Sequence, residues 1–374
     1  MGIALRELRR NPGRFGVATV TLTLIAMLLI FLGALLDGLL RSITGGYLAQ
    51  PGQLVVLSSD ANSVLSGSVL PAETREEVVA TLPEGAEVGG FSTLTVGARL
   101  ESADERDLTG VTLYGVELAP SGVPLDELSD GEVWADHDLP FTAGDVLLLG
   151  PAQVEVTVAG ISDDGASPSE GGLWTSPLTW NEVQAASRPG AALPEGASQG
   201  LVVSLPDGDT LSGDDLAALA AEVDDATGTT ASLTTQEAAN AIPGVAEQQT
   251  TFAQIQIVTL AIALLVVALF FALLTVERTG LYGVLKAMGS RTSRIFAGVV
   301  LQAFVVTMIA GAIGSALVLA AGYFIPPGSV PFALSPGLFL TSAGSLALAA
   351  IIGSAFSLRR VLAIDPAAAI GGDA

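Results

Sequence analysis

The sequence predicts a membrane protein with four transmembrane α-helices, one before and three after a large α+β extracytoplasmic domain. Half of the residues are hydrophobic although the formal net charge is −23, a combination that a single water-soluble core does not usually produce. Residues 42–247 contain 33 of the 38 acidic residues and only four of the 15 basic ones. Outside them lie four apolar runs, each long enough as a helix to cross a hydrocarbon core about 30 Å thick. The acidic stretch is therefore predicted to be a water-exposed domain inserted into a membrane-embedded frame.

The order of apolar and polar stretches predicts the segment boundaries. We expect a cytoplasmic amphipathic segment at 1–14, a first span at 15–41, the extracytoplasmic domain at 42–247, a second span at 248–276, a cytoplasmic coupling segment at 277–294, a third span at 295–324, an outer loop at 325–336, a fourth span at 337–358 and a cytoplasmic tail at 359–374. The acidic residues of the large domain are interpreted as a solubility feature rather than as a cation-binding surface. The chain has no cysteine, so neither a disulfide nor thiol chemistry is available to it.

The first span follows a cluster of arginines. Four of them lie between residues 6 and 14, directly before the apolar run 15–40, and such a cluster stays in the cytoplasm. A cleaved signal peptide has an apolar region of only about 7–15 residues, so a retained helix is favoured. Met27 lies within this helix, where a methionine is usually ordinary packing and only occasionally a soft ligand for a metal or haem.

The basic residues also predict the orientation of the chain. Ten of the 15 fall in the segments 1–14, 277–294 and 359–374. Because positive residues accumulate in cytoplasmic loops, both termini are predicted to be cytoplasmic and the acidic domain extracytoplasmic. The expected location is the plasma membrane, as a multi-pass protein.

The acidic domain is predicted to contain both strands and helices. Short runs rich in β-branched residues and bounded by Gly, Pro and Asp predict strands. Two stretches predict helices, one with a proline and acidic residues at its start and one with an apolar face at helical spacing. The predicted strands are 53–58, 111–116, 145–150 and 154–160, and the predicted helices are 71–82 and 211–223.

No catalytic constellation is visible in this domain. The single histidine, His137, stands between Asp136 and Asp138. Together these three side chains form a possible metal site, but an exposed turn is the favoured interpretation. No second histidine and no cysteine exists to complete a zinc site or a nucleophilic triad. We therefore expect a non-catalytic chain without a metal or cofactor of its own.

A polar stretch leads into the second span. Thr234 or Thr235 is a candidate helix N-cap, and a turn is expected at Pro243–Gly244. Polar side chains this close to a membrane entry face water, a partner helix or a cavity, and if they face a cavity they line a substrate path. These side chains are Glu247, Gln248, Gln249, Gln254 and Gln256.

The cytoplasmic segment after the second span is short, basic and amphipathic. Its leucines, valine and methionine recur at i, i+3, i+4 and i+7, which forms one apolar stripe that can dock in a groove of another protein. The cations beside the stripe either take part in docking or serve only as the positive-inside signal. The predicted docking residues are Leu281, Val284, Leu285, Lys286, Met288 and Arg291.

Two further patterns concern energy supply and packing. No G-x-x-x-x-G-K-[ST] sequence occurs, so any ATP hydrolysis must come from a separate chain. The third span contains Gly298, Gly311, Gly314 and Gly322. Small residues at such spacings predict that this helix packs closely against another.

The arrangement of these segments resembles a known family. One span, a large domain, three further spans, the sequence ERTGLYGVLKAMGSRTSRI after the second span and the terminal IDPAAAI resemble the permease subunits of FtsX/MacB-like ABC transporters. The stretches GQLVVLSSDANSVLSGSVL and IPGVAEQQTTF are similar to the DevC/HrtB-type branch, which includes haem-exporter permeases.

The resemblance implies an assembly and a way of working. A homodimer of permeases in the lipid membrane joins a dimer of cytoplasmic ABC ATPases, which bind the ATP and magnesium. Closure of the ATPases moves the membrane helices and, through them, the outer domains. The apolar stripe of the coupling segment is then the expected ATPase-docking surface. No nucleic-acid partner is expected.

Two kinds of activity remain open under this resemblance. Haem export would use Met27 as a soft axial ligand and Glu247 as an oxygen ligand or a contact to a propionate. A lipid, a peptide or a drug is the wider alternative as cargo. From a different functional class, the alternative is an FtsX-like regulator whose outer domain activates a wall hydrolase and transports nothing.

Overall fold

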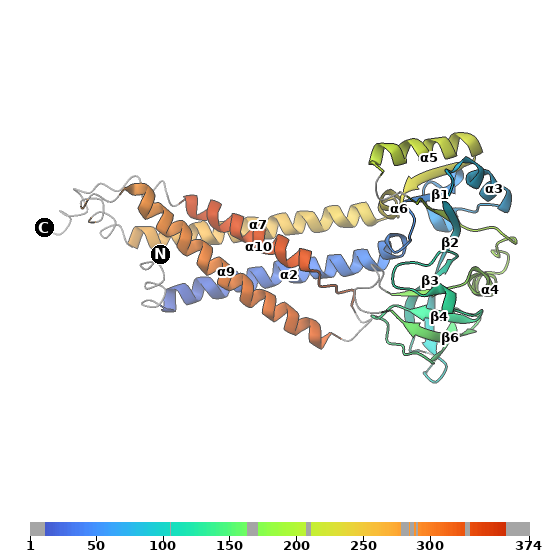
Figure 1. Cartoon of the computed structure of the whole chain (residues 1–374). Coiled ribbons are helices and arrows are strands. Elements are labelled where there is room, and N and C mark those ends of the chain that lie inside the picture. The colour runs from blue at the N-terminus through green and yellow to red at the C-terminus, as the bar shows by residue number, and fades with distance from the viewer. Residues whose placement is uncertain are drawn as a thin grey trace. The chain divides into compact units, whose positions relative to one another are not determined.

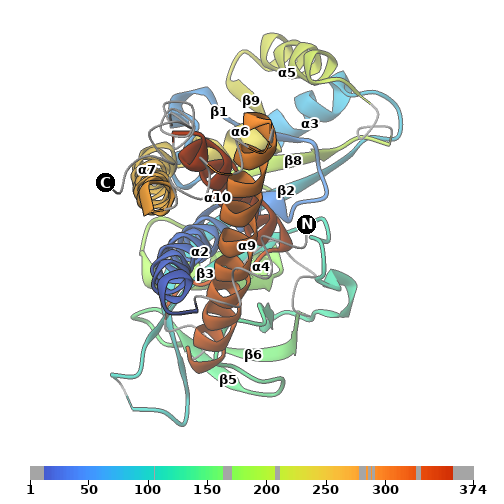
Figure 2. The same ribbon diagram turned by 90° about the vertical axis from the view of Figure 1, so that its left-hand side faces the viewer.

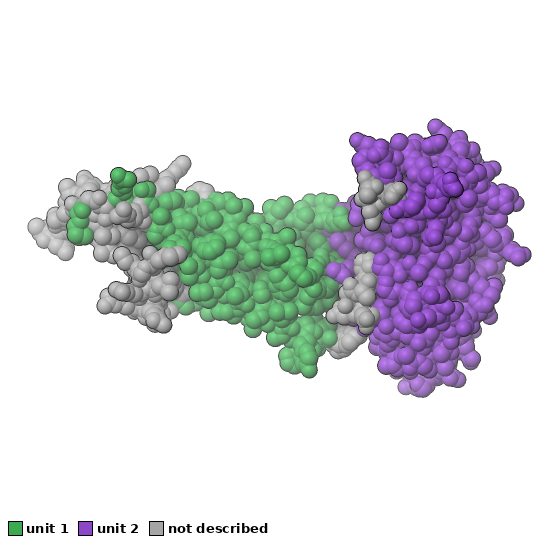
Figure 3. All heavy atoms as spheres, viewed as in Figure 1, with its two compact units in different colours: residues 1–37, 249–325, 332–374 green, residues 38–248, 326–331 purple. Residues whose placement is uncertain are grey.

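The computed structural model describes residues 12–104, 106–162, 171–206, 211–277, 284, 288, 291–325 and 330–356. The chain divides into two compact units, which Figure 3 colours separately. The first, here called the membrane unit, comprises Met1–Asp37, Gln249–Ile325 and Phe332–Ala374. The second, here called the β domain, comprises Gly38–Gln248 and Pro326–Pro331.

Long apolar helices build the membrane unit. They are α2 (Pro12–Leu48), α7 (Val245–Glu277), α9 (Thr292–Phe324) and α10 (Pro336–Phe356), and Figure 1 labels all of them. Within the described part of the chain, these are the four helices long and apolar enough to cross a membrane. Since the β domain is inserted between the first and the second of them, the predicted fold class is confirmed.

The helices α2 and α7 are longer than a membrane requires. They contain 37 and 33 residues, whereas about 20 residues cross a hydrocarbon core about 30 Å thick. They also extend beyond the spans expected from hydropathy, 15–41 and 248–276. Each helix therefore has turns outside the hydrocarbon region.

An apolar core joins the membrane helices. It contains Leu22 of α2, Phe271 of α7, Ala303 of α9 and Ala350 of α10, all buried. Four apolar side chains of α2 are instead about half exposed or more, namely Val17, Val20, Leu24 and Leu28. An exposed apolar face opposite a buried one is what lipid contact requires, because lipid tails are as apolar as leucine.

Glycines allow two of the helix crossings to be close. A Cβ at Gly314 of α9 would stand 3.0 Å from the Cβ of Ala26 and 3.0 Å from the backbone N of Met27 on α2. A Cβ at Gly353 of α10 would stand 2.8 Å from the carbonyl O of Leu264 on α7. The predicted close packing of the third span is thus confirmed at Gly314. It is wrong at Gly298, where no atom lies within 4 Å.

The β domain is organised around one long strand, β2. Its first part pairs with β8, its middle with β3 and its last residues with β5. The strand order is β3-β7-β4-β6-β5-β2-β8-β1-β9, and the additional pairing of β3 with β2 closes the first six strands into a ring. The strands β8, β1 and β9 continue from β2 as an open sheet. The strand bounds are β1 Leu54–Ser58, β2 Glu87–Leu100, β3 Thr109–Val116, β4 Glu132–Ala135, β5 Val146–Leu149, β6 Val154–Ile161, β7 Gly172–Thr175, β8 Gly200–Ser204 and β9 Thr230–Thr234.

Helices cover the β domain, and capping boxes begin α5 and α6. The helices α3 and α5 lie beside the open sheet (Figure 2), and Ser212 and Thr234 each form a capping box, with Asp215 and Glu237 respectively. The prediction of Thr234 as an N-cap is confirmed. The helix bounds are α3 Ala72–Thr81, α4 Pro177–Ser187, α5 Gly213–Thr227 and α6 Thr235–Asn240, with single 3-10 turns at Ser59–Ala61, Leu65–Gly67 and Leu125–Glu127.

Aromatic side chains fill the middle of the β domain. The ring of Tyr47, near the end of α2, lies edge-on to Phe91 at 5.3 Å between centroids. Phe91 stacks on Tyr114, and Tyr114 stacks on Trp174 at 4.4 Å. The last turn of α2 is therefore held within the β domain by aromatic packing.

The sequence around His137 differs from the expected exposed turn. Asp136 is completely buried. Its carboxylate accepts hydrogen bonds from the backbone N–H of Gly172 (2.8 Å) and from Nε1 of Trp174 (2.9 Å). Asp138 accepts a hydrogen bond from the backbone N–H of Gly171 (2.9 Å). Expecting an exposed turn was wrong for Asp136, because its carboxylate satisfies the buried donors of β7.

Candidate functional site

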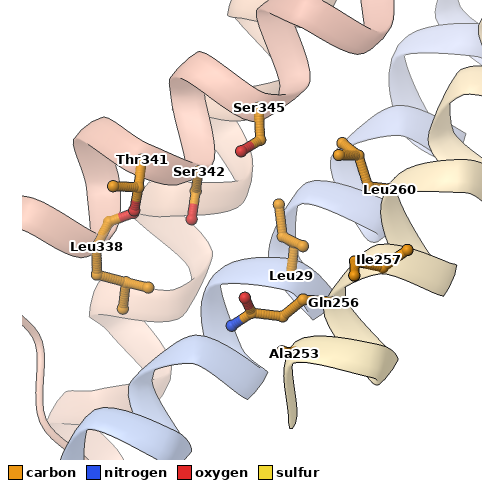
Figure 4. Close-up of a pocket in the computed structure, with 9 residues that line it drawn as sticks. All are labelled: Leu29, Ala253, Gln256, Ile257, Leu260, Leu338, Thr341, Ser342 and Ser345. Carbon is orange, nitrogen blue, oxygen red and sulfur yellow. The ribbon is translucent and has the colours of Figure 1, made fainter. Parts of the chain in front are cut away.

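A pocket lies between three helices of the membrane unit. It encloses about 260 Å³, and Figure 4 shows its lining side chains. They are Leu29 of α2, then Ala253, Gln256, Ile257 and Leu260 of α7, and Leu338, Thr341, Ser342 and Ser345 of α10.

The helical repeat brings these residues to one place. On α7 the lining positions follow i, i+3, i+4 and i+7, starting from Ala253, and on α10 they follow the same spacing from Leu338. Residues at this spacing lie on a single face of a helix. The α10 face carries one threonine and two serines, whose small side chains leave space between the helices.

The N-terminal end of α10 is fixed to α2. The Ser335 hydroxyl donates to the Asp37 carboxylate (2.8 Å) and accepts from the backbone N–H of Leu338 (3.2 Å). The backbone N–H of Ala333 donates to the carbonyl of Ala34 (3.0 Å). The Leu338 side chain packs directly against Gly33. These contacts hold one wall of the pocket in register with α2.

Several polar groups in the pocket have no protein partner. Thr341 donates its hydroxyl hydrogen to a carbonyl of its own helix, that of Gly337 (2.9 Å). Within the described ranges, by contrast, the amide of Gln256 and the hydroxyls of Ser342 and Ser345 make no hydrogen bond to the protein. Figure 4 shows the Gln256 amide and the Ser342 hydroxyl directed into the space between α10 and α7.

One of these residues, Ser342, is buried, whereas Gln256 and Ser345 are half-buried. Ser342 is only 5% exposed, and polar groups buried in apolar surroundings without a hydrogen bond are costly. Polar side chains inside membrane segments generally face a cavity or a pathway. The pocket therefore offers an apolar space with hydrogen-bonding groups from two helices. None of the described residues that line it is titratable, so the lining is suited to binding and not to acid–base chemistry.

Gln256 was expected to face water, a partner helix or a cavity, and in the structure its side chain lines a cavity. That α10 supplies the opposite wall was not predicted. The hydroxyl residues within the fourth apolar run could have indicated this wall. Their direction, however, depends on how α10 packs against α2 and α7.

The predicted haem ligands lie in different units. Met27 is half-buried on α2, where its backbone N approaches Gly314 of α9. It does not line the pocket, whereas Leu29, two residues further, does. Glu247 is exposed in the first turn of α7 and belongs to the β domain. Their joint role as ligands stays a prediction.

The predicted docking residues are described in part. Leu281, Leu285 and Lys286 lie outside the described residues. Val284 and Met288 are 45% and 69% exposed, and the backbone N–H of Met288 donates to the carbonyl of Val284 (2.9 Å), as in one turn of an α-helix. Arg291 is exposed and is the N-cap residue of α9. The two described apolar members of the stripe are thus available to a partner.

Comparison with known sequences identifies one region of the chain. Residues 255–366 match the FtsX-like permease C-terminal family. This region includes much of α7, all of α9 and α10, and most of the residues that line the pocket.

Individual relatives match over a similar part of the chain. A putative hemin transport system permease protein HrtB from Staphylococcus epidermidis is 28% identical over 139 residues, which is 37% of this chain and 39% of that protein. An uncharacterized ABC transporter permease, Mb2592, from Mycobacterium bovis is 40% identical over 114 residues, 30% of this chain and 31% of that protein. The chain thus matches less than half the length of either relative.

Two solved structures resemble the chain at low identity. The extracellular domain of the noncanonic ABC-type transporter YknZ from Gram-positive bacteria gives a TM-score of 0.29 at 15% identity, covering 49% of this chain and 98% of that one. The periplasmic region of MacB from Actinobacillus actinomycetemcomitans gives a TM-score of 0.32 at 11% identity, covering 50% of this chain and 90% of that one.

Proposed function

We propose that this chain, whose residues 255–366 form an FtsX-like permease domain, is the permease subunit of an ABC efflux transporter driven by a separate ATPase. The observation that carries the proposal is the pocket between α2, α7 and α10, whose Gln256 amide and serine hydroxyls make no hydrogen bond to any described residue. An amphipathic molecule has the apolar surface and the polar groups that such a lining can accept.

The continuity of α7 supports mechanotransmission as the way of working. This helix runs without interruption from Val245 to Glu277, so the pocket residue Leu260 and the inner end of the helix belong to one rigid element about 25 Å in length between them. A displacement of Glu277 by a docked ATPase would move the pocket wall. The exposed Val284 and Met288, just beyond α7, support a docking role for the stripe from Leu281 to Met288.

The proposed cargo is haem or another amphipathic molecule. Support for haem comes from the relatives named as hemin transport permeases. Met27 and Glu247 are the proposed ligands in this chain. The pocket of one chain, at about 260 Å³, is smaller than the usual ligand site of about 300–1,000 Å³. We accordingly propose a homodimer in which two copies share the cargo.

The proposed location is the plasma membrane, with both termini in the cytoplasm and the β domain outside. Ten of the 15 basic residues fall in the segments 1–14, 277–294 and 359–374, as the positive-inside rule requires for this orientation. ATP and magnesium would bind to the partner ATPase, so this chain would need no cofactor of its own.

An FtsX-like regulator that transports nothing is the second candidate. It is favoured by the size of the β domain, which takes up more than half of the chain. Both candidate functions require a partner ATPase and the transmission of its movement through α7. They differ in whether a molecule occupies the pocket between the helices.

Filling the pocket tests the efflux proposal. The variant Ser342→Phe places a ring where the structure has a small, 5% exposed side chain. The matched control is Leu340→Phe on the same helix, where Leu340 is 74% exposed. We expect Ser342→Phe to abolish the ATP-driven uptake of haemin into inside-out vesicles that carry the permease and its ATPase, because outward transport in the cell is inward transport in such vesicles. Leu340→Phe should export like the wild type.

Three measurements make the test decisive. Both variants must be present in the membrane at wild-type level. If wild-type vesicles move neither haemin nor an amphipathic dye on addition of ATP, the efflux proposal fails and the regulator remains. The Soret band of bound haemin, compared between the wild type and Met27→Ala, tests the ligand assignment: an unchanged band in Met27→Ala removes Met27 from it.

A further inference from the structure

The β domain contains a second cavity that the proposed function does not use. It encloses about 530 Å³ and lies entirely within this domain, a volume typical of small-molecule sites. Its walls come from the strands β2 and β3, the end of α2, helix α4 and the loop that leads into α7.

One wall is a polar patch on the sheet. Thr93 of β2 pairs with Tyr114 of β3, and Thr95 pairs with Thr112. Because side chains alternate between the two faces of a strand, these four lie on the same face, and all of them line the cavity. They offer hydroxyl groups in two adjacent rows.

A buried amide in the cavity has an unpartnered acceptor. Gln184 of α4 lines the cavity and is only 6% exposed, and its Oε1 has no hydrogen-bond partner among the described residues. The neighbouring Gln199 is different, since its Oε1 accepts from the backbone N–H of Thr93 (2.8 Å). A buried carbonyl oxygen without a donor is rare in folded proteins and calls for an explanation. A ligand N–H or O–H group would supply the missing donor.

A single cation stands beside that amide. Arg188 follows Gln184 by one helical turn, and its backbone N–H donates to the Gln184 carbonyl (2.9 Å). Its exposed guanidinium makes no ion pair with any described residue, whereas Arg75 of the same domain pairs with Glu117. None of the described residues that line the cavity is acidic.

The charge of the domain limits what can bind there. Residues 42–247 carry 33 acidic and four basic residues, so their field repels polyanions such as nucleotides. The Arg188 guanidinium, which makes no ion pair with any described residue, can donate paired hydrogen bonds to one carboxylate. The remaining walls include Ile43, Leu65 and Ile242, which suit an apolar body.

We propose that this cavity is a binding site for a small amphipathic monoanion. Its carboxylate lies at the Arg188 guanidinium, and an N–H or O–H group of the ligand donates to Oε1 of Gln184. Its apolar part rests on the isoleucine and leucine side chains. Ser42 and Tyr47 of α2, and Pro243 directly before α7, also line the cavity. The ligand therefore contacts both connections through which the β domain joins the first two membrane helices.

The tryptophans of the chain provide a local readout of binding. All three, Trp134, Trp174 and Trp180, lie in the β domain. Trp174 stacks on the cavity residue Tyr114. The full-length permease in lipid nanodiscs is titrated with N-octanoylglycine, which carries a carboxylate and an amide N–H, and separately with its neutral methyl ester. Tryptophan emission gives both affinities.

The charge of Arg188 should determine the preference between the two probes. We expect the wild type to bind the acid about tenfold more tightly than the ester, as one charge-assisted contact implies. Arg188→Gln should bind both equally, and the control Arg99→Gln, a cation of the same domain outside the cavity lining, should keep the preference. Equal affinity of the wild type for acid and ester, a preference retained in Arg188→Gln, or no saturable change with either probe overturns the proposal.

The buried amide is tested through a second variant. Gln184→Leu removes the acceptor and nearly keeps the volume, so we expect both probes to bind about fivefold more weakly, by the same factor, because both carry the N–H. Unchanged binding of both probes by a folded Gln184→Leu variant overturns the role of Oε1. Neither titration requires the ATPase or transport, so failure here is distinguishable from failure of the efflux proposal.

Discussion

The buried carboxylate of Asp136 in the β domain and the polar groups of the pocket in the membrane unit differ in whether they are hydrogen-bonded. In the β domain, the fully buried carboxylate of Asp136 accepts two hydrogen bonds, from Gly172 and Trp174. In the membrane unit, the amide of Gln256 and the hydroxyl of Ser342 meet in a pocket without a hydrogen bond to any described residue. Buried polar groups are normally satisfied. The comparison teaches that the hydrogen-bonded carboxylate stabilises the fold, whereas the polar groups of the pocket are available to a ligand.

The largest expected effect follows removal of the satisfied carboxylate. Asp136→Ala leaves the buried N–H of Gly172 and Nε1 of Trp174 without an acceptor, so we expect the β domain to lose about 3–5 kcal/mol of unfolding free energy. Unfolding is followed by tryptophan emission, which reports on this domain alone. The control Asp138→Ala removes one hydrogen bond of a half-buried side chain and should cost about 1 kcal/mol. An equal loss of unfolding free energy in both variants would contradict the special structural role of Asp136.

The next effect concerns the close crossing of α10 and α7 in the membrane unit. Gly353→Leu places a side chain against the Leu264 carbonyl and Val267 of α7, so we expect a loss of about 1–3 kcal/mol from overpacking. The matched control is Gly298→Leu, where no atom lies within 4 Å. It should be neutral or stabilising because leucine favours helix by about 1 kcal/mol over glycine. SDS titrations followed by far-UV circular dichroism compare the unfolding midpoints of the two variants. A lower midpoint for Gly298→Leu than for Gly353→Leu would contradict close packing at Gly353.

A smaller effect is expected at the cap of α6, directly before α7. Thr234→Ala removes the capping box with Glu237 and should cost about 1 kcal/mol. Hydrogen bonds from the Thr234 backbone and side chain lower the pKa of Glu237. The cap therefore stabilises the ionised form at neutral pH, and this contribution is lost as pH falls through the lowered pKa.

The pH dependence distinguishes the cap from a general loss of packing. In Thr234→Ala, the acid-side loss of stability should be shallower than in the wild type. Thr81 is a half-buried threonine that donates only to a carbonyl of its own helix, so Thr81→Ala should follow the wild-type curve. Identical acid-side slopes in wild type and Thr234→Ala would remove the link between the cap and Glu237.

The smallest effect on stability is expected in the pocket itself. Gln256→Leu removes an amide that has no protein partner, so the SDS midpoint should change by no more than about 0.5 kcal/mol or rise slightly. Transport, in contrast, should fall. A stability loss above about 1 kcal/mol would show that the amide serves the fold, and the contrast with Asp136 would then disappear.

Local signals predicted part of the β domain. The runs that became β1, β3, β5 and β6 were recognisable by their β-branched residues and turns. The longest strand, β2, was not predicted because Gly89, Gly90 and Gly97 interrupt its pattern. Two of these glycines are required by tertiary contacts, since a Cβ at Gly89 or Gly90 would stand 2.6 Å from Leu118 or 3.2 Å from Ser198. Neither neighbour can be read from the strand itself.

The candidate site was predictable on one wall only. Gln256 was identifiable as a polar residue near a membrane entry, and a cavity was one of the three environments predicted for its side chain. Thr341, Ser342 and Ser345 could be seen as hydroxyl residues in an apolar run. Their common face toward Gln256 depends on the contacts of Ser335 with Asp37 and of Leu338 with Gly33, which join distant parts of the chain.

The sequence by itself determined that the chain has four membrane helices with an acidic domain inserted after the first. It could do so because hydropathy and charge act through local composition, and the cost of burying charge in lipid leaves few alternatives. Only the tertiary structure decided that six strands close into a ring through β2, that Asp136 is buried, and that Gln256 and Ser342 share a pocket. Those features depend on which distant residues pack together, and packing determines whether a polar group finds a partner or remains available to a ligand.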